Sequence, residues 1–215
     1  QEATIQGDPA LHENIRVAGS HTGLGFNAMV DGLRDRDFIS NTFGRYVDQE
    51  FAREILKRPE AARLGGEKRR VAVLMSDIRG FTALADSLKP EGTILILNRY
   101  FDRMVQPVQR HKGIIIDFFG DGLLVFFDPL DGPVRPVLRN AVGCALEMQS
   151  DMALFNGELK GQGLPQFQMG IGINAGEVVV GNIGTEYRAK YGIVGTPVNL
   201  TERIQSQAGG GEVVV

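Results

Sequence analysis

Apolar residues recur along this chain with two periods, and the change from one to the other predicts strands and helices in turn. Residues 71–75 are an unbroken apolar run, which is typical of a strand buried on both faces. Two later apolar runs flank Gly120, Asp121 and Gly122, and an Asp-Gly pair between strand-like runs favours a tight hairpin. We predict strands at residues 71–75, 113–119, 122–127, 167–174, 177–181, 191–194 and 212–215, the fifth being the hairpin partner of the fourth.

Segments with helical periodicity lie between these strands. Residues 92–111 place their apolar side chains on one side and contain Pro107, which is expected to kink or shorten the helix. Farther along the chain, Pro197 suits the first turn of a helix. We predict helices at residues 82–88, 92–111, 136–155 and 197–207, with loops at 128–133 and 157–165. The resulting βαββαβ order indicates an α+β sandwich of the ferredoxin-like kind.

The first third of the chain has a different pattern. Residues 1–23 are polar, show no sustained period and are expected to be partly disordered. Residues 24–66 combine a narrow apolar stripe with a charged opposite face. Such a stripe fits a signalling or dimerisation helix that meets a partner helix, and it fits a helix packed on its own domain equally well. We expect residues 64–70 to form a polar, glycine-containing link, and we place the main domain at residues 67–215.

Composition narrows the class of protein. The chain has 215 residues, of which 43% are hydrophobic and 23% charged, enough for one packed domain with an appendage. A net charge of −3 and a pI near 5.7 do not favour a nucleic-acid partner. The single cysteine, Cys144, excludes an internal disulfide and fits a reducing compartment. We find neither a membrane-length apolar run nor a signal peptide, so a cytoplasmic location is expected.

Two aspartates are the first candidates for chemistry. Asp77 ends the first strand, and Asp121 lies in the predicted hairpin turn. Each can be explained structurally, since aspartate is common at strand ends and in turns. If the first strand lies beside the hairpin, however, the carboxylates emerge at one edge and repel each other at an effective dielectric constant of roughly 20. A divalent cation with phosphate oxygens would relieve that repulsion, and hard oxygen ligands suit Mg²⁺ or Mn²⁺.

Four motifs, taken together and in this order, resemble the class III nucleotidyl (adenylate and guanylate) cyclases. They are Asp-Ile-Arg-Gly-Phe-Thr at 77–82, Phe-Gly-Asp at 119–121, Gly-Ile-Asn-Ala-Gly-Glu at 172–177 and Val-Asn-Leu-Thr-Glu-Arg at 198–203. The resemblance covers residues 70–215, most of the family's catalytic domain. Residues 24–56 are similar to the HAMP-like signalling helix that precedes such domains in receptor-type members, whose membrane anchor would lie outside this sequence.

The resemblance implies a homodimer in which two subunits meet head to tail and share each site. Asp77, Asp121 and the carbonyl of Ile78 would hold two Mg²⁺ or Mn²⁺ ions per site. Asn199 and Arg203 of the other subunit would orient the ribose and meet the charge on the phosphoryl oxygens.

The same resemblance assigns substrate contacts. The turn at Gly80, Phe81 and Thr82 would face the phosphates of the nucleotide. Asp117 and Thr196 occupy the two base-reading positions. Threonine at 196 fits ATP, whereas the Asp117 carboxylate would accept from the N1–H and N2 amino groups of guanine.

We therefore expect an adenylate cyclase that converts ATP to 3′,5′-cyclic AMP and pyrophosphate, with guanylate cyclase as the alternative. The family usually continues beyond this sequence with a lysine that contacts the phosphates, so the activity of this form could be reduced. A third possibility is a catalytically weak, cyclase-like module that binds nucleotide or dimerises. The four residues Asp77, Asp121, Asn199 and Arg203 favour an enzyme, because such a module is free to lose them.

Overall fold

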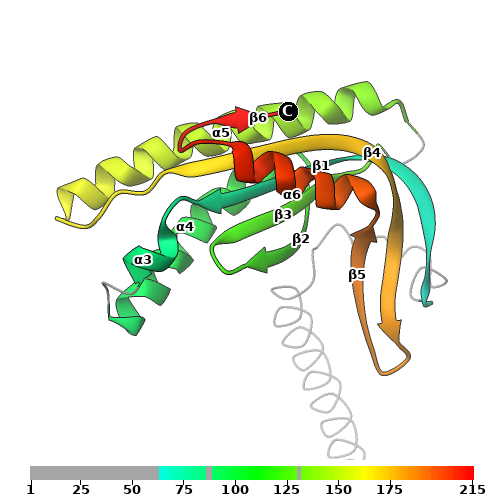
Figure 1. Ribbon diagram of the computed structural model, residues 1–215, viewed down its shortest axis with the longest axis horizontal. Helices are drawn as coiled ribbons and strands as arrows, with labels where there is room; N and C mark the ends of the chain where they lie inside the picture. The colour runs from blue at the N-terminus through cyan, green and yellow to red at the C-terminus, as the bar shows by residue number, and fades with distance from the viewer. Residues whose placement is uncertain (1–62, 86–88, 130–131) are drawn as a thin grey trace, which may run out of the picture. The chain divides into compact units, whose positions relative to one another are not determined.

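A single sheet forms the centre of the domain (Figure 1). The computed structural model describes residues 63–85, 89–129 and 132–215, so the expectations for residues 1–23 and for nearly all of 24–66 lie outside the described residues. The strands are β1 (Gly65–Ile78), β2 (Ile114–Phe119), β3 (Gly122–Phe127), β4 (Met169–Thr185), β5 (Arg188–Val194) and β6 (Val213–Val214). The helices are α3 (Phe81–Ala85), α4 (Pro90–Arg110), α5 (Val134–Gly161) and α6 (Thr196–Gln207). The sheet order is β2-β3-β1-β4-β5, with β6 pairing with β4.

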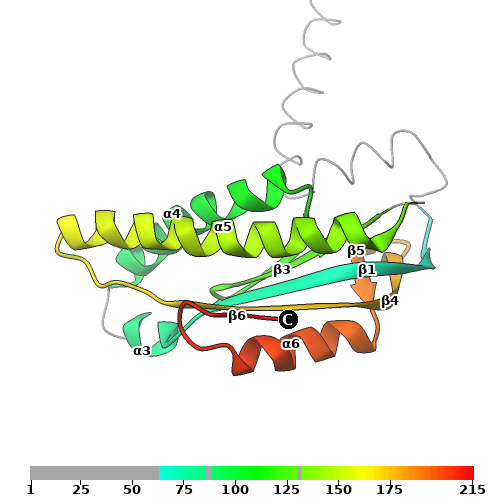
Figure 2. The same cartoon turned by 90° about the horizontal axis from the view of Figure 1, so that it is seen from above.

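Helices cover both faces of this sheet. Figure 2 shows α4 and α5 on one face and α6 on the other. Alternate residues of β1 therefore enter different apolar clusters, because successive side chains of a strand point to opposite faces. Ala72 and Leu74 pack with the α4 and α5 side, whereas Val71 and Val73 join the cluster on the α6 side. The prediction of a strand buried on both faces, and of an α+β sandwich, is confirmed.

The predicted hairpin of residues 177–181 is wrong. β4 is one strand of 17 residues, and it stays paired with β1 through the expected turn, where Val73 faces Asn174 and Val71 faces Gly176. Gly176 has a packing role instead of a turn role. A Cβ at this position would lie 2.4 Å from Cγ of Pro197 on α6.

Other expectations for the elements also differ from the structure. Residues 65–70 are not a link but the start of β1, whose polar side chains are exposed apart from the half-buried Arg69, while its backbone pairs with β4. The loop predicted at 157–165 begins later, because α5 continues to Gly161 and buries Leu159 one turn beyond Phe155. Pro107 does not cut α4 short, since the helix continues to Arg110.

The hairpin around Asp121 is confirmed. β2 and β3 pair with Phe119 opposite Gly122, and Gly120 adopts a left-handed conformation with φ of 61° in the turn. Within the described ranges, no helix combines the length and apolar character needed to cross a membrane.

Candidate active site

The ends of β1 and of the β2–β3 hairpin bring Asp77 and Asp121 together. β1 pairs antiparallel with β3, with Ser76 opposite Leu123, so the next residue of β1 lies beside the hairpin turn. Gly122 permits this close approach, because a Cβ there would lie 2.7 Å from the carbonyl oxygen of Ser76. The backbone N–H of Ile78 donates to Oδ2 of Asp121 at 2.9 Å. Two carboxylates that are 44 residues apart in sequence thus lie together where β1 ends and the β2–β3 hairpin turns.

The surroundings of this pair disfavour two full negative charges. Burial, and then the negative charge of Asp77, raise the pKa of Asp121 to about 6, although the hydrogen bond from Ile78 opposes the shift. Tyr100 lies fully buried nearby and donates its hydroxyl to Sδ of Met169 at 3.2 Å. Burial raises the pKa of this phenol, and the charges of Asp121 and Asp77 raise it further. The pair is therefore a place where a cation would lower the electrostatic free energy.

The donor set around the pair is small. In the part of the chain that the structure describes, no group of three His, Cys, Asp or Glu side chains is placed to hold a metal ion. Any cation at Asp77 and Asp121 would need further oxygens from backbone carbonyls, water or a bound phosphate. Magnesium typically binds in this manner, with one or two carboxylates plus substrate phosphates.

The turn after Asp77 leads directly into α3. Gly80 has a φ of 71°, a conformation that favours glycine, and Thr82 is exposed. Phe81 is half-buried, and its ring lies 6.4 Å from that of Phe167, between centroids. The Phe81 side chain therefore belongs to the edge of the core, so a substrate contact at this position would come from its backbone.

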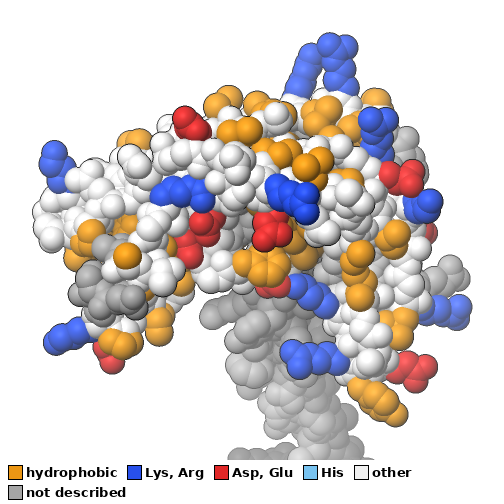
Figure 3. All heavy atoms as spheres, viewed as in Figure 1, with side chains coloured by type: hydrophobic (Ala, Val, Ile, Leu, Met, Phe, Trp, Pro, Cys, Tyr) orange, Lys and Arg blue, Asp and Glu red, His pale blue; other side chains and the backbone are white. Residues whose placement is uncertain are grey.

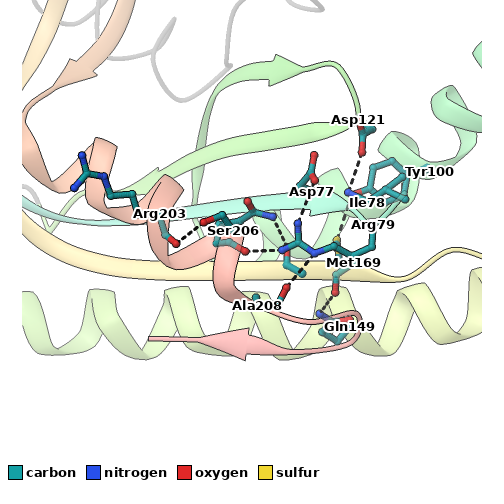
Figure 4. Close-up of polar contacts among 12 residues, drawn as sticks. Asp77, Ile78, Arg79, Tyr100, Asp121, Gln149, Met169, Arg203, Ser206 and Ala208 are labelled. Carbon is teal, nitrogen blue, oxygen red and sulfur yellow. Dashed lines mark hydrogen bonds and ion pairs between the residues drawn. The ribbon is translucent and has the colours of Figure 1, made fainter. Parts of the chain in front are cut away.

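Asn199 and Arg203 lie on α6, away from the carboxylates. Both side chains are exposed and line a surface hollow together with Glu202 and Ser206, and neither Asp77 nor Asp121 lines it. Figure 3 shows acidic and basic side chains close together beside α6 on this face, and in Figure 4 the Arg203 side chain points away from Asp77. One chain thus presents two separate sets of candidate residues.

α6 rests directly on the backbone of β4 through glycines. A Cβ on Gly172 would lie 2.4 Å from the backbone nitrogen of Gln205, and Gly176 lies under Pro197. Residues 170, 172, 174 and 176 share this face of β4 because side chains alternate along a strand. The period-two pattern of residues 167–174 therefore has a further meaning: its isoleucines fill the core, and its glycines seat the helix that carries Asn199 and Arg203.

Residues 66–215 match the family model of the adenylate and guanylate cyclase catalytic domain. The chain belongs to this family. Its fold is similar to that of the guanylyl cyclase Cya2, with 47% sequence identity and a TM-score of 0.66 over 70% of this chain and 76% of that chain. It is also similar to the adenylyl cyclase CyaB from P. aeruginosa, with 32% identity and a TM-score of 0.65 over 70% and 78% of the two chains.

Relatives of known sequence are longer. An uncharacterised protein of Mycobacterium tuberculosis, Rv1319c, is 39% identical over 207 residues, which are 95% of this chain and 36% of that protein. A second one from the same organism, Rv1320c, is 38% identical and is covered over 34% of its length. The cyclase chain spans about a third of the length of the curated relatives it matches. The cyclase resemblance is confirmed, whereas the HAMP-like segment before it stays a prediction.

The sequence analysis did not single out Arg79. In the cyclase domain its guanidinium lies between Asp77 and the end of α6, with Nη1 3.3 Å from Oδ2 of Asp77. Its position inside the Asp-Ile-Arg-Gly-Phe-Thr motif, two residues after Asp77, could have indicated a role near the carboxylates. The partners at the end of α6, Gln205 and the following Ala208, are 126 and 129 residues away, however, and no local pattern predicts contacts over that separation.

Lys190 is the second residue that was missed. Its ammonium group on β5 forms an ion pair with Oδ2 of Asp117 on β2, and Oδ1 of Asp117 accepts from the N–H of Phe118 at 2.9 Å. Both side chains are partly exposed, so the pair is available to a ligand. Thr196, the other predicted base-reading residue, is the first residue of α6 and is exposed.

Proposed function

We propose that this cyclase domain converts a purine nucleoside triphosphate to its 3′,5′-cyclic monophosphate at centres shared by two copies of the chain. The observation that carries the proposal is the convergence of Asp77 and Asp121 at one edge of the sheet, while Asn199 and Arg203 line a separate hollow. A centre that uses both sets is completed when α6 of a second copy faces the carboxylate pair. The family membership supports the same reaction.

Mg²⁺ or Mn²⁺ fits the carboxylate pair. Burial, and then the negative charge of Asp77, raise the pKa of Asp121, and a divalent cation would offset both effects. The available ligands are hard oxygens, which suit such a cation. Asp77, Asp121 and the carbonyl of Ile78 would hold two such ions. When bound, the ions would neutralise the triphosphate and make the ribose 3′-hydroxyl more acidic.

The residues on α6 would position the reacting atoms. Asn199 and Arg203 are four residues apart and share one exposed face, so both can reach the same nucleotide. Asn199 would orient the ribose, and Arg203 would donate to phosphoryl oxygens as their charge grows. A bond forms between the 3′-oxygen and the α-phosphorus, the bond to the bridging oxygen breaks, and the hydroxyl proton leaves to solvent. Pyrophosphate is the leaving group.

We infer that GTP is the preferred substrate. The ion pair of Asp117 and Lys190 places an acceptor beside a donor. A guanine edge offers two donors, N1–H and the N2 amino group, and one acceptor, O6, which match this pair. The guanylyl cyclase Cya2 is 47% identical to this chain, compared with 32% for the adenylyl cyclase CyaB, and this difference supports the same preference.

ATP, the substrate expected from the sequence, is the second candidate. The ammonium group of Lys190 could donate a hydrogen bond to adenine N1. The Asp117 carboxylate could not, because it only accepts hydrogen bonds at neutral pH. The resemblance of Thr196 to members that use ATP also favours it.

A side-by-side assay would decide between the substrates. Cyclic GMP and cyclic AMP are measured from GTP and ATP with Mn²⁺ under the same conditions. We expect a higher kcat/KM for GTP. A higher value for ATP would reverse the substrate assignment, and no product from either nucleotide would leave only the binding-module alternative.

A mixing experiment would test the shared centre. Asp77→Ala and Arg203→Ala should each abolish the activity of the homodimer while leaving its circular dichroism spectrum unchanged. When the two inactive proteins are mixed and exchange subunits, one centre of each heterodimer regains all its residues, so activity should return. Demonstrated subunit exchange without activity would contradict the shared centre.

A further inference from the structure

The side chain of Arg79 joins two parts of the molecule that the proposed reaction uses. Its Nη1 lies 3.3 Å from Oδ2 of Asp77, its Nε donates to the carbonyl oxygen of Ala208 at 3.0 Å, and its Nη2 donates to the carbonyl oxygen of Gln205. Figure 4 shows the guanidinium between the carboxylate and the end of α6. One side chain thus contacts the Asp77 carboxylate and the helix that carries Asn199 and Arg203.

Each of these contacts has a clear physical basis. The carbonyl groups in the last turn of a helix form the negative end of its dipole, so a cation is favourable beside Gln205 and the C-cap residue Ala208. A guanidinium is planar and presents its donors in a fixed fork, which lets it serve several acceptors in different directions. The ammonium of a lysine could not reproduce this geometry.

The fold leaves room for this guanidinium. A Cβ on Gly170 of β4 would lie 2.2 Å from Nη2 of Arg79, so only glycine permits the observed position. The Arg79 side chain is 28% exposed, and its orientation is held by the strand below it and by the helix end beside it.

The contact with Asp77 is directional. Arg79 holds Oδ2, whereas Oδ1 of Asp77 lies on the hairpin side, 3.6 Å from the position that a Cβ on Gly122 would take. One oxygen is therefore kept for Arg79, and the other is directed towards the hairpin that carries Asp121.

We propose that Arg79 is a positioning residue that couples the orientation of Asp77 to the placement of α6 in the same subunit. This inference rests on the proposed function, in which a subunit contributes Asp77 to one centre of the dimer and Asn199 and Arg203 to the other. Arg79 therefore links the two catalytic centres: a shift of α6 at one centre changes the carboxylate geometry at the other.

The mixture of Asp77→Ala and Arg203→Ala subunits separates the two contacts. Its one complete centre takes Asp77 from the Arg203→Ala subunit and Arg203 from the Asp77→Ala subunit. Arg79→Met, which keeps the length of the stem but removes the donors, is introduced into one subunit at a time. In the Arg203→Ala subunit it should raise the KM for Mn²⁺, and in the Asp77→Ala subunit it should lower kcat with the KM for Mn²⁺ unchanged. We expect losses of about tenfold to a hundredfold, as for other groups that support metal ligands.

A second measurement does not depend on turnover. Mn²⁺ binding is followed by electron paramagnetic resonance in the presence of a non-cyclisable GTP analogue, with otherwise unmutated protein. Arg79→Met should weaken Mn²⁺ binding by about tenfold or more, and Arg79→Lys should recover part of it because the positive charge remains. If Arg79→Met does not fold, as judged by its melting temperature, Arg79→Lys is used in all arms.

Arg103 provides a matched control. It is 29% exposed, pairs with Glu158 and lies over the ring of Phe155, in contacts between α4 and α5. Arg103→Met should leave the KM for Mn²⁺ and Mn²⁺ binding unchanged. Equal losses in this control, or an unchanged mixture with Arg79→Met in either subunit, would overturn the coupling. A mixture without Arg79 variants that shows no activity would instead contradict the shared centre, and Mn²⁺ binding would then decide the role of Arg79.

Discussion

The surroundings of Asp121 differ from those of an ordinary surface carboxylate. Its pKa of about 6 lies above the usual 3.8, first because of burial and then because of Asp77. The folded protein without metal consequently holds a proton on Asp121 more tightly than the unfolded chain does. By linkage, the contribution of this group to the free energy of unfolding is greatest below pH 4 and is lost as the pH rises to about 6.

This sign can be tested in EDTA. We expect the free energy of unfolding of the metal-free protein, measured with urea, to carry a component that falls as the pH rises from about 4 to about 6. Asp121→Asn, which stays neutral, should lack that component. Parallel pH profiles for the two proteins would show that Asp121 does not titrate with a raised pKa.

Asp117 gives a second prediction at this scale. Asp117→Lys replaces the acceptor with a donor, so it should shift the ratio of kcat/KM for GTP and ATP towards ATP by roughly tenfold, the value of one hydrogen bond to a charged group. The product assay described for the wild type measures this ratio.

Two controls accompany that change. Asp102→Lys makes the same exchange at an exposed position of α4 and should leave the ratio unchanged. The double variant Asp117→Lys, Lys190→Asp keeps an ion pair between β2 and β5. If neither Asp117→Lys nor the double variant alters the ratio, Asp117 does not contact the base.

Single residues could be predicted where a motif or a turn marks them. Asp77 and Asp121 were predicted to converge, because an apolar strand and a hairpin leave few ways to pair. Lys190 was not predicted, because its partner Asp117 lies 73 residues away on β2, a strand that does not pair with β5. That contact depends on how the sheet curves, which the hydrophobic pattern does not specify.

At the scale of elements, the position of α6 depends on the absence of side chains from one face of β4. Gly170, Gly172 and Gly176 leave the backbone of β4 bare under Arg79, Gln205 and Pro197. The same glycines explain the wrong hairpin prediction at residues 177–181. Glycine in a strand pattern signals either a turn or a close approach, and only the three-dimensional position of α6 distinguishes the two.

Gly172→Ala tests whether α6 packs directly against the backbone of β4. The added Cβ would lie 2.4 Å from the backbone nitrogen of Gln205, so α6 must move away from β4. We expect a loss of about 1–3 kcal/mol in the free energy of unfolding, as for other overpacked sites, together with reduced kcat. Gly192→Ala on β5 is the control, since its Cβ would meet only Cδ1 of Ile183 at 3.7 Å, an ordinary contact. Equal stability of the two variants would contradict the close seating of α6.

At the scale of the whole molecule, shared centres predict that activity depends on assembly. The specific activity should fall when the protein is diluted below the dissociation constant of the dimer, because each centre needs residues from two chains. Sedimentation velocity at the same concentrations measures the monomer fraction. A monomer that keeps full specific activity would require a different arrangement of catalytic residues.

β1 has a consequence for how the domain could be controlled. All 14 residues of this strand, Gly65–Ile78, are paired with β4, and Asp77 is the penultimate one. The polar residues 65–70 at its start are therefore part of the sheet, and each of them is paired with β4. A twist imposed at residue 65 would be carried along β1, which pairs with β4 alone up to Val71 and also with β3 from Ala72 to Ser76, and would rotate the carboxylate that faces the hairpin.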